Sequence, residues 1–158
     1  MNTDYLFLGD SITDSNHLWL PETNGLGDGY VAMLADRLGP DARITNKGID
    51  GFTVAALLER LQRGFLKAHP DVISLLIGIN DIGVALNTGV TLEELQFAEN
   101  YKEVLKCLSD TGANLLCSGP FYLPSSSEIS DLDLLCVGTG TDHGRNLFLT
   151  VCSIYSTA

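Results

Sequence analysis

The chain has 158 residues, 45% of them hydrophobic, and carries 20 acidic against 9 basic residues, for a net charge of −11. This length suits a single domain, and the apolar content excludes a disordered linker. The acidic excess argues against nucleic acids and anionic membrane surfaces as partners. We therefore expect one acidic globular domain over residues 1–158.

Targeting, membrane and metal-binding signals are weak. Asp4 stands where a secretory signal would carry basic residues. The longest apolar run, 72–79, falls short of the roughly 20 residues that a membrane helix needs. The cysteines show no C-x-x-C spacing, so we expect reduced thiols; they are Cys107, Cys117, Cys136 and Cys152. These features predict a cytoplasmic protein with no membrane partner, metal or cofactor.

Apolar runs with little polar alternation predict strands that are covered on both faces. Four such runs are Tyr5–Leu8, Ala42–Asn46, Val72–Ile79 and Ala113–Cys117. A fifth strand at 134–137 leaves barely enough chain for a crossover helix before it, and 147–155 has the pattern of a strand rather than a helix.

Three segments between the runs have helical spacing of apolar residues. They cover Tyr30–Leu38, 54–65 and 95–108. Thr91 and Glu94 have the spacing of a capping box before the third, and Gly112 favours a stop after it. The alternation of strands and helices predicts an α/β fold with a mostly parallel sheet of four to five strands and helices on both faces.

Polar and small residues follow three of the predicted strands. Gly9-Asp10-Ser11-Ile12-Thr13 follows the first, Asn46-Lys47-Gly48-Ile49-Asp50-Gly51 the second, and Gly78-Ile79-Asn80-Asp81 the third. Ligands bind at the carboxyl ends of parallel strands. Ser11 supplies a hydroxyl, Gly48 an accessible backbone N–H and Asn80 a side-chain donor, as nucleophilic catalysis with charge stabilisation requires. Each piece alone has a simpler interpretation as a helix cap or turn.

These segments resemble the first three blocks of the SGNH hydrolase superfamily, the GDSL esterases and lipases, and the resemblance covers about residues 4–124. It implies a flavodoxin-like three-layer α/β/α sandwich and metal-free hydrolysis of small acyl esters or acetylated carbohydrates. Ser11 would be the nucleophile. Its own N–H, the Gly48 N–H and the Asn80 side chain would hold the oxyanion. Asp10 would hold the turn.

The last family block, D-x-x-H, has no counterpart in this sequence. His143, directly preceded by Asp142, is the candidate base with its partner, although Gly140 stands where the family's Asp would be. His17 is expected in a solvated loop, and His69 at a helix C-terminus. Because charge and helical period fade after about residue 130, the tail 130–158 is atypical, and we hypothesise a truncated or frame-shifted end.

Other interpretations stay open at this point. The chain is either an active esterase or a catalytically impaired SGNH scaffold that binds esters without turnover; a third option is a flavodoxin-like domain that uses Asp10 and Asp81 for a divalent ion or phosphate. Leu18, Trp19 and Leu20 would line an acyl pocket or cover the sheet edge. An open edge beside the fourth strand predicts marginal stability or a homodimer.

Overall fold

The computed structural model describes residues 2–66 and 69–119 and the backbone of 148–150. Within these residues the chain forms a five-stranded parallel sheet with the order β2-β1-β3-β4-β5. The strands are β1 (Thr3–Gly9), β2 (Ala42–Gly48), β3 (Val72–Leu76), β4 (Asn114–Ser118) and β5 (Phe148–Thr150). Gly9 pairs with Gly48 on one side and with Leu76 on the other. The carboxyl ends of β2, β1 and β3 therefore lie level with one another.

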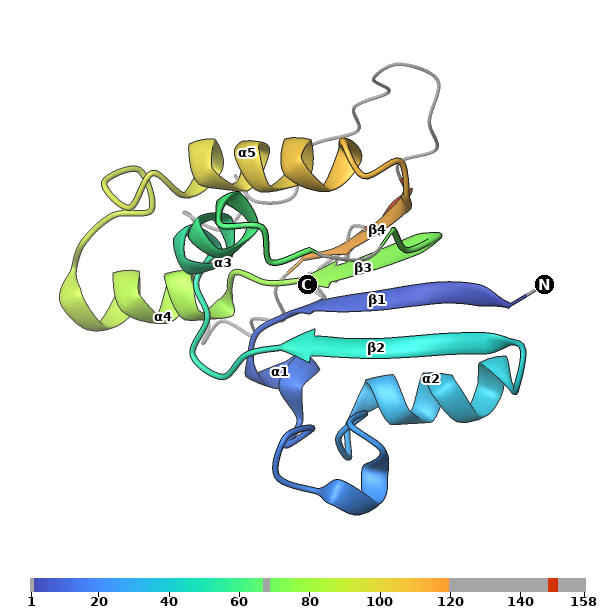
Figure 1. Ribbon diagram of the computed structural model, residues 1–158. Coiled ribbons are helices and arrows are strands. Elements are labelled where there is room, and N and C mark those ends of the chain that lie inside the picture. The colour runs from blue at the N-terminus through green and yellow to red at the C-terminus, as the bar shows by residue number, and fades with distance from the viewer. Residues whose placement is uncertain (1, 67–68, 120–147, 151–158) are drawn as a thin grey trace, which may run out of the picture.

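Helices cover both faces of this sheet. They are α1 (Ser11–Asp14), the 3-10 turn η1 (Pro21–Thr23), α2 (Tyr30–Leu38), α3 (Val54–Gln62), α4 (Ile79–Thr88) and α5 (Phe97–Ser109). Figure 1 shows α3 and α5 on one side of the sheet and α2 on the other. The described part of the chain therefore has the predicted three-layer α/β/α arrangement, and the α/β fold is confirmed.

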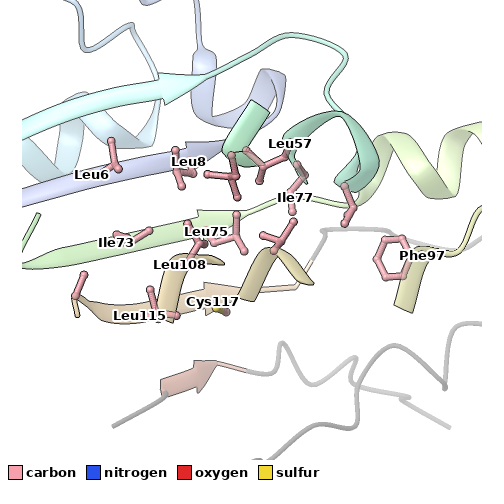
Figure 2. Packing of buried hydrophobic residues seen from close by; sticks show 14 residues of the cluster. Leu6, Leu8, Leu57, Ile73, Leu75, Ile77, Phe97, Leu108, Leu115 and Cys117 are labelled. Atoms are coloured by element: carbon pink, nitrogen blue, oxygen red, sulfur yellow. The ribbon is translucent and has the colours of Figure 1, made fainter. Parts of the chain in front are cut away.

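The main core lies between the sheet and the α3–α5 layer (Figure 2). Side chains of β1 alternate, so that Leu6 and Leu8 join this core while Phe7 points to the opposite face. There Phe7 packs edge-to-face on Tyr30 of α2, with ring centroids 5.9 Å apart. Because both faces are covered, β1 needs the near-continuous apolar run by which it was predicted.

Most predicted elements are found, with shifts at the third strand. The apolar run 72–79 predicts one long strand, but β3 ends at Leu76 and α4 begins at Ile79. Gly78, with φ +121°, lies between them, a backbone conformation that side chains disfavour. The helix α4 was therefore missed, because its first residue, Ile79, continues the apolar run of β3.

The start of α5 also differs from the prediction. The capping box is present: Thr91 Oγ1 accepts the Glu94 N–H at 3.1 Å, and Glu94 Oε2 accepts the Thr91 N–H at 2.8 Å. It closes a separate turn, however, and α5 begins only at Phe97. The predicted stop is confirmed, since α5 ends at Ser109 and Gly112 has φ +84°.

The tail is described only at β5, which falls inside the predicted strand 147–155 and pairs with β4. The candidate strand 134–137 lies outside the described residues. Cys107 and Cys117 are free thiols, as predicted, whereas Cys136 and Cys152 are not described. Among the described helices, none is long and apolar enough to cross a bilayer.

Candidate active site

Ser11 is the first residue of α1 and directly follows the turn that ends β1. Its side chain is exposed, while Gly9 and Asp10 before it are buried. A Cβ on Gly9 would lie 2.2 Å from Leu76 O and 2.3 Å from Thr13 Oγ1, so only glycine fits there. Among the described residues, the Ser11 N–H has no acceptor. The turn therefore presents a hydroxyl and an unpaired N–H together.

Asp10 is the N-cap of α1. Its carboxylate accepts the Ile12 N–H at 3.0 Å, and the residue is only 1% exposed. Burial raises the pKa of the Asp10 carboxyl, and the hydrogen bond from Ile12 offsets part of that rise. The predicted role of Asp10 in holding the turn is confirmed.

Gly48 lies at the end of β2 and packs directly against α1. A Cβ at this position would lie 2.1 Å from Asp14 N and 2.6 Å from the Thr13 carbonyl carbon. The Gly48 N–H donates to Asn46 Oδ1 at 2.9 Å. An amide has one hydrogen to give, so this bond disfavours the predicted role of Gly48 as an oxyanion donor, which stays a prediction.

Asn46 is a buried polar residue that the sequence did not single out. Its Nδ2 donates to Thr13 O at 2.7 Å and to Leu26 O at 2.9 Å. Together with the bond from Gly48, the side chain uses both its donor and its acceptor capacity. It ties the end of β2 to α1 and to the loop that follows α1.

The loop 49–53 joins β2 to α3 and borders the turn that precedes Ser11. Ile49 N–H donates to Gly9 O at 3.0 Å, and Phe52 N–H donates to Ile49 O at 3.2 Å. Between them, Gly51 is exposed with φ +71°, and its N–H has no acceptor among the described residues. The sequence places Gly51 in the same segment as Gly48, but sequence reasoning gave the donor role to Gly48 alone; the available signal was this second glycine three residues later.

Two residues in the first turn of α4 form hydrogen bonds to the backbone at the end of this loop and at the start of α3. Asn80 Nδ2 donates to Phe52 O at 2.8 Å, which uses one of its two hydrogens. The buried Asp81 carboxylate accepts the Val54 N–H at 3.0 and 3.3 Å. Burial raises the pKa of Asp81, and the nearby Asp10 charge raises it further.

The structure thus brings Ser11 of α1, Gly48 of β2 and Asn80 of α4 to one edge of the sheet, the carboxyl edge. Asp10 and Asp81 also lie at this edge. Both carboxylates are buried and accept backbone N–H groups. Each carboxylate therefore holds the N-terminal turn of a helix, α1 for Asp10 and α3 for Asp81. These contacts are structural and do not favour the interpretation in which Asp10 and Asp81 bind a divalent ion or phosphate.

The histidines are placed differently from one another. His17, expected in a solvated loop, is instead buried, and its Nδ1 is hydrogen-bonded to Asp14 Oδ1 one helical turn earlier. His69, expected at a helix C-terminus, is exposed and instead lies between the end of α3 at Gln62 and the start of β3, at the opposite edge of the sheet from Ser11. His143 and Asp142, the candidate base and its partner, lie outside the described residues.

The loop after α1 leaves two large apolar side chains in solvent. Leu18 is 76% and Trp19 is 79% exposed. Neither residue covers the sheet edge, so that expectation is wrong for this pair. The backbone around them is held by the Trp19 N–H, which donates to Asn16 O at 2.9 Å.

Comparisons with known proteins identify relatives of this chain. The curated acetylxylan esterase of Geobacillus stearothermophilus is 32% identical over 136 residues, which cover 78% of this chain and 62% of that enzyme. The crystal structure of a catalytic mutant of an acetylxylan esterase from that organism aligns with a TM-score of 0.65 at 30% identity, over 82% of this chain and 65% of the other. A hydrolase from the metagenome of Lake Arreo, Spain, described as an α/β hydrolase, aligns with a TM-score of 0.67 at 26% identity, over 81% of this chain and 65% of its own.

This chain therefore spans a little under two thirds of the length of these relatives. The model of the GDSL-like lipase/acylhydrolase family matches residues 7–135, which include Ser11, Gly48 and Asn80 and end before Asp142. With this match over most of its length, the chain belongs to the GDSL-like lipase/acylhydrolase family.

Proposed function

We propose that this protein is a serine esterase that hydrolyses small acyl esters or acetylated carbohydrates. One observation carries the proposal: the exposed Ser11 begins α1 at the carboxyl edge of the sheet, the edge where the loop of Gly51 and the first turn of α4 with Asn80 also lie. Membership of an acylhydrolase family supports the ester bond as the target. The acetylxylan esterase relatives support an acetylated carbohydrate as the natural substrate.

The chemistry is acyl transfer through Ser11. Its Oγ attacks the ester carbonyl carbon while a base takes the hydroxyl proton. The bond to the alcohol then breaks, and the alcohol leaves with that proton. Water next attacks the acyl-serine, releasing the acid and restoring Ser11.

Within the described part of the chain, three N–H groups that have no acceptor are available to stabilise the negative oxygen of the intermediate. They are the Ser11 N–H, the Gly51 N–H and the second Nδ2 hydrogen of Asn80. We assign Gly51 in place of Gly48, because the Gly48 N–H is already bonded to Asn46. Pre-positioned donors of this kind contribute about 10²–10³ in turnover each.

His143 is the proposed base and Asp142 its partner. The two histidines in the described part of the chain suit the role less well. His69 lies at the far edge of the sheet, and His17 has its Nδ1 on Asp14. Since a base oriented by a carboxylate is the usual arrangement, His17 is the rival that the experiment must separate from His143.

The test is hydrolysis of p-nitrophenyl acetate and release of acetate from acetylated xylan by the full chain. Ser11→Ala should lower kcat by about 10⁴-fold or more, while Ser118→Ala, which removes a hydroxyl at the end of β4, should leave it unchanged. His143→Ala should lower kcat by about 10³-fold or more, and His17→Ala should not. Equal activity in wild type and Ser11→Ala would refute the serine mechanism; a folded wild type that binds esters without turnover would instead support an impaired scaffold.

A further inference from the structure

Two neighbouring residues of α4 hold the loop 52–54 at two points. Asn80 donates to the carbonyl of Phe52 at 2.8 Å, and Asp81 accepts the N–H of Val54 at 3.0 Å. The backbone held by these two bonds, residues 52–54, directly follows Gly51. A third contact, from Ile49 N–H to Gly9 O, fixes the other end of the loop to the strand that leads to Ser11.

We propose that Asp81 is a positioning residue for the active site, which fixes the loop 51–54 and thereby the Gly51 N–H and the Asn80 amide relative to Ser11. The proposal rests on the proposed esterase function for its effect on catalysis. It goes beyond that function because Asp81 touches neither the ester nor the reacting atoms in the scheme above.

Burial makes the contact between Asp81 and Val54 decisive for the loop. Val54 is fully buried and Asp81 is 4% exposed, so water is a poor substitute partner for either group. The side chain of Thr53 is committed to another amide, that of Ala56, at 3.2 Å. Without the Asp81 carboxylate, the Val54 N–H would lose its acceptor, and the loop would settle in a different position to recover one.

The same contact sets the orientation of Asn80. Because Asp81 is the next residue along α4, its anchorage to α3 fixes the first turn of α4 and with it the Asn80 backbone. Phe52 O then takes one amide hydrogen and leaves the other in a defined direction. A displacement of about 1 Å in such a group is enough to cost roughly a hundredfold in rate.

The sequence offers a matched control. Asp71 also accepts a backbone N–H with its carboxylate, that of Asp4 at 2.8 Å. This contact lies where β1 and β3 begin, at the edge of the sheet opposite Ser11. Asp71→Ala therefore removes the same kind of contact without touching the site.

The experiment compares Asp81→Ala, Asp81→Asn and Asp71→Ala in the full chain. Steady-state hydrolysis of p-nitrophenyl acetate should show kcat lowered about ten- to a hundredfold in Asp81→Ala with KM little changed. Asp81→Asn keeps an oxygen for the Val54 N–H and should recover most of the loss. Asp71→Ala should keep the wild-type kcat, even if its melting temperature falls.

Amide hydrogen exchange supplies a readout that needs no activity. Exchange at Val54 should accelerate at least about tenfold in Asp81→Ala and stay close to wild type in Asp81→Asn. Unchanged exchange at Val54, or an unchanged kcat in Asp81→Ala, would overturn the positioning role. If the wild type hydrolyses no ester, the proposed function fails by that result, and the exchange measurement alone decides whether Asp81 positions the loop.

Discussion

Gly48 and Asn46 are joined by a local hydrogen bond, in which the backbone N–H of Gly48 donates to the side-chain oxygen of Asn46 at 2.9 Å. The pair sits under α1, and a Cβ on Gly48 would overlap Asp14 N at 2.1 Å. Asn46 also carries bonds to Thr13 and Leu26. The end of β2 therefore supports α1, the helix that begins at Ser11. Gly48 has this supporting role, whereas Gly51 is exposed.

Asn46→Ala should lower the free energy of unfolding by about 3 kcal/mol, because it leaves buried carbonyl groups and the Gly48 N–H without partners. Asn46→Asp should cost more, since a carboxylate accepts from Gly48 but faces the carbonyls of Thr13 and Leu26 without a hydrogen to donate. Urea unfolding measures both. Asn114→Ala, at an exposed residue, is the control and should change stability by less than about 0.5 kcal/mol. A smaller loss in Asn46→Asp than in Asn46→Ala would contradict this account.

Alanine substitution of Gly48 and of Gly51 should lower the stability by different amounts. Gly48→Ala forces α1 away from β2, so we expect a loss of about 3 kcal/mol or a failure to fold. Gly51→Ala meets open space and pays only for φ +71°, about 1 kcal/mol. Both variants retain the N–H. Urea midpoints give the ranking, and a Gly48→Ala variant as stable as Gly51→Ala would show that the packing at Gly48 is loose.

Local patterns allowed much of this fold to be predicted. The strand runs, the helix Tyr30–Leu38 and the capping role of Asp10 depend on residues close in sequence, so their signals are present in short windows. The helix α4 was missed because Ile79 extends the apolar run of β3, and only the backbone turn at Gly78, φ +121°, separates them.

The sequence singled out Ser11 and Asn80 because each supplies a chemical group by itself, and their catalytic roles stay predictions. Sequence patterns do not show where the availability of a group depends on a contact elsewhere in the fold. The sequence alone does not distinguish Gly48 from Gly51 as a backbone donor. The structure does, because the Gly48 N–H already donates to Asn46. For His17, the spacing from Asp14 was a usable signal, because residues three apart face each other on a helical turn.

His17→Ala should lower the free energy of unfolding by about 1–3 kcal/mol, since it leaves the Asp14 carboxylate, 13% exposed, without its hydrogen-bond partner. His69→Ala removes the same side chain at an exposed position and should change stability by less than about 0.5 kcal/mol. Urea unfolding of the two variants in parallel checks this. Equal stabilities would mean that the contact between His17 and Asp14 contributes nothing in solution.

Stability should depend on the protonation of Asp10 and Asp81. Burial raises the pKa of both carboxyls above the ordinary 3.8, so in this range the folded chain binds more protons than the unfolded chain. Their contribution is therefore fully present below pH 3.8 and is lost as the pH rises through the higher folded values.

Asp10→Asn removes one of these titrations and keeps an oxygen for the Ile12 N–H, because asparagine caps helices about as well as aspartate. The variant should be at least as stable as the wild type at pH 7, and its stability should fall less between pH 4 and pH 7. It should also lower the pKa of Asp81, because the Asp10 charge is one cause of the rise of that pKa.

The control is Asp36→Asn, on the exposed side of α2. It changes the net charge by the same unit and should leave the pH dependence of stability as it is in the wild type. Urea unfolding across this pH range gives the slopes, and identical slopes for Asp10→Asn and wild type would show that Asp10 titrates alike in the folded and unfolded chains.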